Sequence, residues 1–198
     1  MRGHGATEQS RAAEIVDGLQ AVMARQGYEA ASVAEVARAA GLTTGLVHYH
    51  FGSKQEILLA LTERLGEAIE ARLRAKLAKA QDPRAKLEAA LDVHLARGQG
   101  DPAALACWVA IGAEAIRQPE VREAYSAVLQ RRQELLSSLL REALRELGRP
   151  TRGARAGAAG LSAAIEGYFQ LAAAAPGLVP AGSAARSAKQ MLGGLLGA

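Results

Sequence analysis

Hydrophobic positions recur every three or four residues along the chain, which is the spacing of helices that each bury one side. The first such stripe lies in residues 8–26 and consists of Ile15, Leu19, Val22 and Met23. Gly27 follows the stripe at a position where a glycine commonly ends a helix. This pattern predicts a first helix over residues 8–26.

Capping signals divide the rest of the chain into further helices. At two places a serine stands three residues before a glutamate, which is the spacing of a capping box: Ser32 with Glu35, and Ser53 with Glu56. Asp-Pro pairs at 82–83 and 101–102 combine an N-cap with a proline at the first helical position. The remaining helices are therefore expected at 32–40, 43–51, from 53 onward, 83–97, 102–117, 119–147, 152–174 and 181–196.

Composition supports an all-α fold of about nine helices. Apolar residues make up 49% of the chain and charged residues 22%, the balance of a globular protein. Aromatic residues are only 4%, so alanine and leucine, which favour helices over strands, carry the packing. No apolar run reaches the roughly 18 residues of a membrane span. We therefore expect a cytoplasmic protein without a membrane partner, consistent with its single cysteine, Cys107.

Residues 32–51, SVAEVARAAGLTTGLVHYHF, form the most specific functional pattern in the chain. Two short helices flank a turn at Gly41, whose lack of a side chain permits the backbone angles of a tight turn. Ala37 is small enough for the two helices to cross closely, and apolar residues at 36, 42 and 47 hold them together. The pattern is typical of a helix-turn-helix, whose second helix enters the DNA major groove.

The exposed positions of this unit are the expected DNA contacts. The net charge of +4 is modest, so we expect a few well-placed donors and helix N-termini to provide the affinity for phosphate. The residues expected at base edges are Thr43, Thr44, Leu46 and Tyr49, those expected at phosphates are Ser32, His48 and Lys54, and Gly45 and His50 complete the set.

Residues 10–55 resemble the N-terminal domain of the TetR/AcrR family of bacterial transcriptional regulators. The resemblance is carried by ASVAEVARAAGLTTGLVHYHFGSKQEIL, with one departure: this family commonly has a phosphate-contacting tyrosine where this chain has His48. The resemblance implies a DNA-binding domain at 1–52, joined by the fourth helix to a helical ligand-binding and dimerisation domain at 53–198. It also implies a repressor that a small-molecule inducer releases from a palindromic operator.

The second half of the chain is more loosely similar to the C-terminal domain of choline-sensing repressors of betaine synthesis. The similarity rests on ACWVA at 106–110, QP at 118–119 and IEGYF at 165–169. A quaternary ammonium ion is held by aromatic faces because it has no hydrogen to donate. The expected ligand residues are therefore Trp108, Tyr125, Tyr168 and Phe169, with Glu114 or Glu166 as counter-charge. An apolar inducer, or aromatics that belong only to the core, are the alternatives.

The last two expected helices are the candidate dimer interface that the family resemblance implies. A helix-turn-helix reads only half of a site, so a two-fold partner increases affinity. Small residues let helices approach closely, as a bundle between two subunits requires. The expected interface residues are Leu161, Ala164, Ile165, Tyr168, Met191, Leu192 and Leu195. The alternative is that this face packs within the chain.

Other functional classes have weaker support in the sequence. His48 and His50 stand two apart and point in different directions on a helix, so we expect no metal site. The chain has neither a phosphate-binding glycine loop nor a nucleophile elbow, so we expect neither an enzyme nor a cofactor. A helical scaffold whose N-terminal helices bind a protein partner remains the alternative to a DNA-binding regulator. Only DNA binding would weaken steeply with salt.

Overall fold

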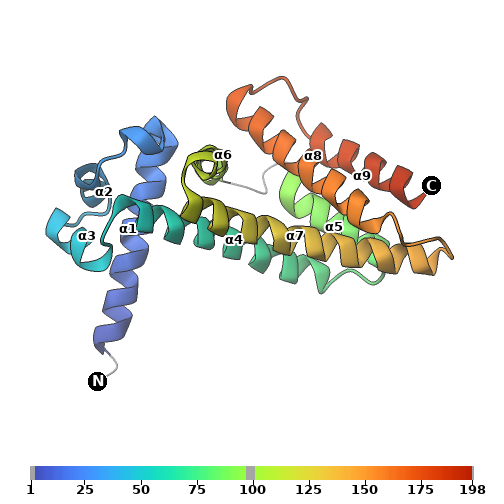
Figure 1. Ribbon diagram of the computed structural model, residues 1–198, viewed down its shortest axis with the longest axis horizontal. Helices are drawn as coiled ribbons and strands as arrows, with labels where there is room; N and C mark the ends of the chain where they lie inside the picture. The colour runs from blue at the N-terminus through green and yellow to red at the C-terminus, as the bar shows by residue number, and fades with distance from the viewer. Residues whose placement is uncertain (1–2, 97–100, 198) are drawn as a thin grey trace. The chain divides into compact units, whose positions relative to one another are not determined.

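The computed structural model describes residues 3–96 and 101–197, and each regular element in this part of the chain is a helix (Figure 1). The helices are α1 Gly3–Ala30, α2 Val33–Ala39, α3 Thr44–His50, α4 Lys54–Leu77, α5 Pro83–Leu95, α6 Pro102–Arg117, α7 Pro119–Glu146, α8 Ala154–Ala174 and α9 Ser183–Leu196. The prediction of an all-α protein with about nine helices is confirmed. None of the described helices has the length and apolar character of a membrane span.

The first helix differs most from the sequence expectation. Gly27 has φ 79° and ψ 171°, so it takes the positive φ that only glycine adopts easily. The chain nevertheless returns to helical geometry at residues 28–30, and α1 extends to Ala30. Gly27 therefore breaks the helical geometry where the sequence predicted an end, and a short helical segment follows it within α1.

The chain divides into two compact units. Unit 1 comprises Met1–Leu65 and Pro102–Tyr125, and unit 2 comprises Gly66–Asp101 and Ser126–Ala198. Helices α4 and α7 each contribute residues to both units. The expected functional division at residue 52 falls inside unit 1 and stays a prediction.

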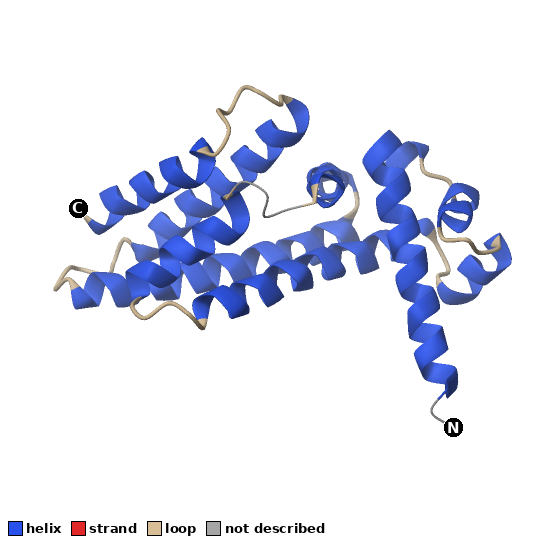
Figure 2. Cartoon of the chain, turned by 180° about the vertical axis from the view of Figure 1, so that it is seen from behind, coloured by secondary structure: helices blue, strands red, loops and turns tan. Residues whose placement is uncertain are grey.

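Unit 1 has one hydrophobic core, to which α1, α2, α3, α4, α6 and the start of α7 contribute. Short loops, drawn in tan in Figure 2, separate α1, α2 and α3. Fully buried side chains from four of these helices meet in this core: Ile15, Leu19, Val36, Ile57, Leu61 and Ile111. Cys107 also lies in it, with its thiol 3.4 Å from the Gln20 carbonyl oxygen. Helix α6 is therefore packed together with the helix-turn-helix.

Gly18 lets α1 and α2 approach more closely than the sequence pattern indicated. A Cβ atom at this position would lie 2.7 Å from the Val36 carbonyl oxygen and 3.2 Å from the Ala40 Cβ. Gly18→Ala is therefore expected to lower the free energy of unfolding by about 1–3 kcal/mol, the usual effect of overpacking. Urea denaturation checks this prediction, with Gly193→Ala as the control because a Cβ there meets nothing within 4 Å. Equal stability of the two variants would contradict it.

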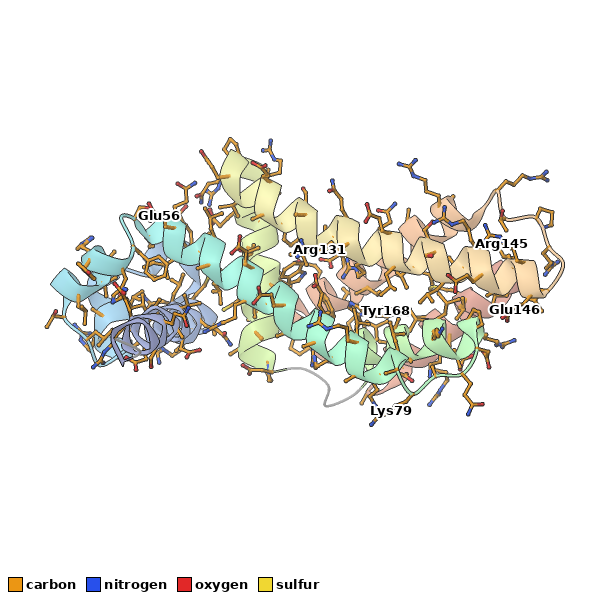
Figure 3. All side chains as sticks on the ribbon, turned by 90° about the horizontal axis from the view of Figure 1, so that it is seen from below. Glu56, Lys79, Arg131, Arg145, Glu146 and Tyr168 are labelled. Carbon is orange, nitrogen blue, oxygen red and sulfur yellow. The ribbon has the colours of Figure 1, made fainter. Side chains whose placement is uncertain are left out.

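Unit 2 has its own core, in which α5, α8 and α9 pack against the second halves of α4 and α7. Its fully buried members are Leu87, Leu91, Leu136, Leu140, Leu161, Ile165 and Leu192. At the surface of this unit, Arg131 of α7 pairs with Glu70 of α4; Figure 3 labels Arg131 and shows α4 and α7 side by side. Arg145 and Glu146 are exposed near the end of α7.

Candidate nucleic-acid interface and ligand residues

The start of α2 is fixed by the expected capping box. The Glu35 backbone N–H donates to the Ser32 hydroxyl at 3.2 Å, and the Ser32 backbone N–H donates to the Glu35 carboxylate at 2.9 Å. Gln26 donates to the same carboxylate at 3.1 Å. Hydrogen bonds from the backbone and hydroxyl of Ser32 lower the pKa of Glu35 to about 2. The first helix of the helix-turn-helix therefore begins at a well-defined residue.

The turn between α2 and α3 depends on Gly41, which has φ 69°. The Leu42 N–H donates to the Ala37 carbonyl oxygen at 2.9 Å, which closes the end of α2. Val36 and Val47 are fully buried between the helices, and Leu42 packs at the edge of this core. The sequence prediction of a helix-turn-helix held by these apolar residues is confirmed.

Helix α3 presents a polar, accessible surface. It begins at the Thr43 hydroxyl, which accepts from the Leu46 N–H at 3.2 Å. The exposed members of the expected DNA set are Ser32, Thr43, Thr44, Gly45, His48 and Tyr49, whereas Leu46, His50 and Lys54 are partly buried. Tyr49 is the most exposed large side chain of the helix, at 73%, and its hydroxyl donates to Glu8 at 3.4 Å.

Lys54, expected at a phosphate, has other partners in this structure. Its ammonium donates to the carbonyl oxygens of Tyr28 and Ala31, each at 2.9 Å, and lies 4.2 Å from the centre of the Tyr28 ring. Lys54 therefore caps the last turn of α1, and contact with phosphate stays a prediction. The start of α4 differs slightly from the capping box expected for Ser53 and Glu56. The Glu56 carboxylate accepts a hydrogen bond from the backbone N–H of Gly52 at 3.0 Å. Glu56 is labelled in Figure 3.

Three of the six expected ligand residues lie in unit 1. The ring centres of Trp108 and Tyr125 are 4.6 Å apart, with an angle of 36° between the ring planes. Gly112 permits this arrangement, because a Cβ there would lie 3.2 Å from the Tyr125 hydroxyl. Glu114 is buried, and its two carboxylate oxygens accept from Arg117 and Gln118, each at 2.8 Å. Arg117 and Gln118 stand three and four positions after Glu114, and this helical spacing was the available signal for the two partners.

The other three expected ligand residues lie in unit 2, where one of them, Glu166, pairs with a buried arginine that was not predicted from the sequence. Arg132 is 8% exposed and donates to Glu166 at 2.7 Å and to the Ser162 hydroxyl at 3.1 Å. The ring centres of Phe169 and His94 are 6.4 Å apart. Tyr168 and Phe169 both pack against the core of unit 2. A charged residue at a core-facing position of α7 was the available signal. The candidate residues thus form two clusters, one in each unit.

His94 is held neutral inside unit 2. Burial lowers its pKa to about 4, with the charges of Arg132 and Arg72 acting in the same direction. Unfolded His94 takes up a proton near pH 6.5, so its contribution to stability is lost as the pH falls from about 6.5 to about 4. His94→Gln is expected to lose less stability than the wild type over this range in urea denaturation at several pH values. Parallel pH profiles would contradict this expectation.

The expected dimer residues divide between the core and the surface of unit 2. Leu161, Ile165 and Leu192 are buried in the chain's own core, as in the alternative that this face packs within the chain. Ala164 and Tyr168 are partly buried. Met191 and Leu195 are 50% and 41% exposed. The exposed face of α8 is lined by small residues: Ala156, Ala159, Gly160, Ala163 and Gly167.

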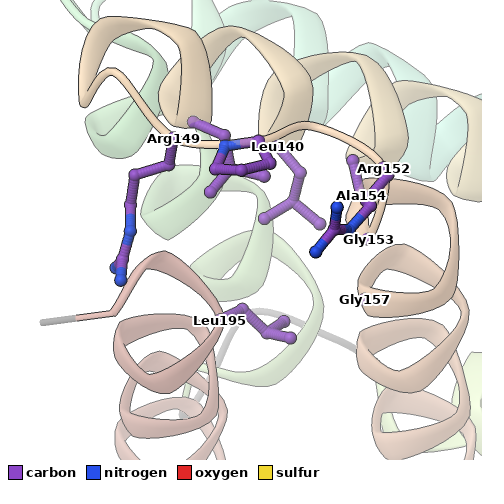
Figure 4. Close-up of a pocket in the computed structure, with 9 residues that line it drawn as sticks. Leu140, Arg149, Arg152, Gly153, Ala154, Gly157 and Leu195 are labelled. Atoms are coloured by element: carbon purple, nitrogen blue, oxygen red, sulfur yellow. The ribbon is translucent and has the colours of Figure 1, made fainter.

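A groove of about 320 Å³ lies at one end of unit 2, where α7 ends, α8 begins and α9 ends. Figure 4 shows Arg149 and Arg152 on opposite sides of it, with Leu140 and Leu195 between them. Arg149 also donates to the Leu196 carbonyl oxygen at the end of α9. The groove contains none of the expected ligand residues. Among the described residues, no group of three His, Cys, Asp or Glu has the arrangement of a metal site.

Comparison with known proteins matches both halves of the chain. Residues 15–61 match the family described as bacterial regulatory proteins, tetR family, and residues 83–197 match the BetI-type transcriptional repressor C-terminal family. The HTH-type transcriptional regulator BetI of Rhizobium meliloti is 33% identical over 162 residues, which cover 82% of this chain and 77% of that protein. BetI of Stenotrophomonas maltophilia is 35% identical over 144 residues, or 72% of this chain and 71% of that protein.

Solved structures have the same fold. A transcriptional regulator from Rhodococcus sp. Rha1 has a TM-score of 0.81 and 27% identity, covering 94% of this chain and 96% of that one. A transcriptional regulator from Saccharomonospora viridis, solved in complex with choline, has a TM-score of 0.79 and 22% identity, covering 96% of each chain.

Proposed function

Because the chain belongs to the TetR family of transcriptional regulators and has a BetI-type C-terminal domain, we propose that it is a repressor that choline or a similar cation releases from a palindromic operator. The regulators it resembles are not enzymes, and the chain is a ligand-responsive DNA-binding regulator. The repressing direction, the identity of the ligand and the form of the operator are the proposed parts. We also propose that it acts in the cytoplasm, where its DNA is.

The observation that carries the proposed DNA contact is the exposed face of α3 on a capped and tightly packed helix-turn-helix. Thr44, Gly45 and Tyr49 are exposed on this short helix, while Val47 anchors its opposite side in the core. Threonine and tyrosine side chains donate and accept hydrogen bonds at base edges. Glycine leaves room for close approach to the DNA. Ser32 and His48 are exposed beside this face, where they suit phosphate contacts.

The proposed homodimer forms through α8 and α9. Small residues line the exposed side of α8, and Met191 and Leu195 supply exposed apolar side chains on α9. Two such helix pairs can pack closely because small side chains let the backbones approach. The two-fold axis then presents two copies of α3 to the two halves of an operator.

The proposed cation site is built on the Trp108–Tyr125 pair. Two aromatic rings at 4.6 Å supply the π faces that attract a quaternary ammonium ion. The choline complex of the Saccharomonospora viridis regulator, which shares the fold, supports the choice of ligand class. Of the two candidate counter-charges, Glu114 lies in the same unit as the two rings, and both of its carboxylate oxygens already accept hydrogen bonds, from Arg117 and Gln118. An apolar inducer is the other candidate.

Choline titration of a protein–operator complex tests this proposal. We expect choline to lower the fluorescence anisotropy of a labelled duplex bound by the wild-type protein. Trp108→Ala should lose this response, whereas Trp108→Phe should keep part of it because it retains an aromatic face. Release by choline with equal midpoints in all three proteins would contradict the proposed site. No release of the wild-type complex would contradict choline as the ligand.

A further inference from the structure

Residues 28–31, which are the last three residues of α1 followed by Ala31, are held by side chains from other elements and directly precede the helix-turn-helix. Gly27 interrupts the helical geometry of α1, and Ser32 caps α2 immediately after the segment. Lys54 of α4 contacts the backbone of this segment, and Arg117 of α6 contacts the side chain of its Glu29. Any displacement of this segment therefore acts directly on the start of α2.

Helix α4 holds the segment through Lys54. The ammonium accepts no hydrogen bonds and has three N–H groups to donate, which it directs to the carbonyl oxygens of Tyr28, Glu29 and Ala31. A lysine at the C-terminal end of a helix also stabilises the helix dipole. Lys54 thus ties the segment to the first turn of α4.

Helix α6 holds the other side of the segment through Arg117. One guanidinium nitrogen of Arg117 lies 2.9 Å from the Glu29 carboxylate on α1 and 2.8 Å from the Glu114 carboxylate on α6. Gln118 occupies the second oxygen of Glu114 at 2.8 Å. Burial, followed by the charges of Glu114 and Glu29, raises the pKa of Tyr28, which places the tyrosine in the same cluster.

Glu114 is the buried residue among the three charged side chains Glu29, Arg117 and Glu114. Its side chain is 7% exposed, whereas those of Arg117 and Glu29 are 61% and 73% exposed. A buried carboxylate is strongly disfavoured without hydrogen-bonding partners, so Glu114 fixes the positions of Arg117 and Gln118. The guanidinium that reaches Glu29 is therefore held in a defined place on α6.

We propose that Glu114 and Arg117 are positioning residues that couple α6 to the DNA-reading helices through Glu29 and the last turn of α1. This inference rests on the proposed function, because DNA binding is the output that the coupling affects. Trp108 lies on α6 six positions before Glu114, so a ligand at Trp108 would act on the helix that carries the pair. Because coupling between two binding events is reciprocal, DNA binding must change ligand binding at Trp108 by the same coupling free energy.

The only tryptophan of the chain, Trp108, makes this return effect measurable without any ligand. The experiment titrates full-length protein with a palindromic duplex selected by the wild-type protein from random-sequence DNA. Anisotropy of the labelled duplex reports binding, and the emission of Trp108 at saturating duplex reports the response of α6. We expect binding of the duplex to change the emission in the wild-type protein.

Glu29→Gln is the decisive variant because it removes the α1 side of the bridge and leaves the buried Glu114–Arg117 pair in place. Exposed ion pairs contribute at most about 1 kcal/mol, so the variant should fold and its duplex Kd should stay within about fivefold of the wild type. Its emission change at saturating duplex should be lost. Glu88→Gln in α5, which removes an exposed ion pair with Arg84, is the matched control and should keep the full change.

The outcomes separate the inference from the proposed function on which it rests. If Glu29→Gln keeps the full emission change, or if the wild-type protein binds the duplex with unchanged emission, the coupling role is overturned. If no duplex is enriched or bound by the wild-type protein, DNA binding itself fails. Loss of the change in both Glu29→Gln and Glu88→Gln would also overturn the coupling role, because it would show a general effect of charge.

Discussion

Replacing Thr44 with aspartate is expected to lower the affinity for operator DNA by at least about 100-fold, because like charges brought together at an interface are disfavoured by several kcal/mol. Thr44 is exposed at the first position of α3, so the new carboxylate would face the DNA. A dimer would bring two such carboxylates to one operator. An acidic residue in the first turn of a helix is favourable, so the fold should not be weakened.

Fluorescence anisotropy of a labelled operator measures this effect, and thermal denaturation checks the fold. Ala71→Asp is the matched control, since Ala71 is exposed on α4 in unit 2 and a carboxylate there adds the same charge. We expect the control to bind within about threefold of the wild type. Equal affinity of Thr44→Asp and Ala71→Asp would show that α3 does not face the DNA.

Replacing Glu166 with leucine is expected to lower the free energy of unfolding by about 3 kcal/mol, since it leaves the charge of a buried arginine without its carboxylate. Arg132 is 8% exposed and would retain only the Ser162 hydroxyl among these partners. The double variant Arg132→Met with Glu166→Leu removes both charges. It is expected to be close to the wild type in stability, because apolar residues of similar volume often replace a buried ion pair without loss.

Urea denaturation of the two single variants and the double variant measures the interaction between Arg132 and Glu166 directly. A double variant more stable than Glu166→Leu gives a favourable interaction energy in the cycle. If the double variant instead loses as much free energy of unfolding as the two single variants lose together, the two charges do not stabilise one another. The stability of unit 2 would then depend on the side-chain volumes alone.

The helices were predictable because their boundaries depend on neighbouring residues. Ser32 and Glu35 are three positions apart, and their mutual hydrogen bonds follow from that spacing alone. Likewise, Pro83 and Pro102 begin α5 and α6 as expected from proline at the first helical position. Gly27 shows both the use and the limit of local signals, since the helical geometry breaks there as predicted but resumes for residues 28–30.

The part of the candidate site that lies on one short segment could be predicted from the sequence. The part that depends on residues far apart in the sequence could not. The exposed face of α3 follows from the helix-turn-helix pattern. In contrast, Arg117 and Glu29 are 88 positions apart, and no spacing rule connects them. The close approach of Gly18 to Val36 is similarly a property of two packed helices. The aromatic residues were selected for their chemistry, and the fold distributes them between two units.

Selection of bound fragments from the source genome with ligand-free protein is the most direct measurement of operator binding. The protein should first be unfolded and refolded to remove any bound ligand. We expect enrichment of fragments with a palindromic sequence, and an affinity that falls steeply with salt as phosphate contacts are lost. No enriched sequence at low salt, or an affinity independent of salt, would contradict DNA binding by the helix-turn-helix and favour a protein partner for the N-terminal helices.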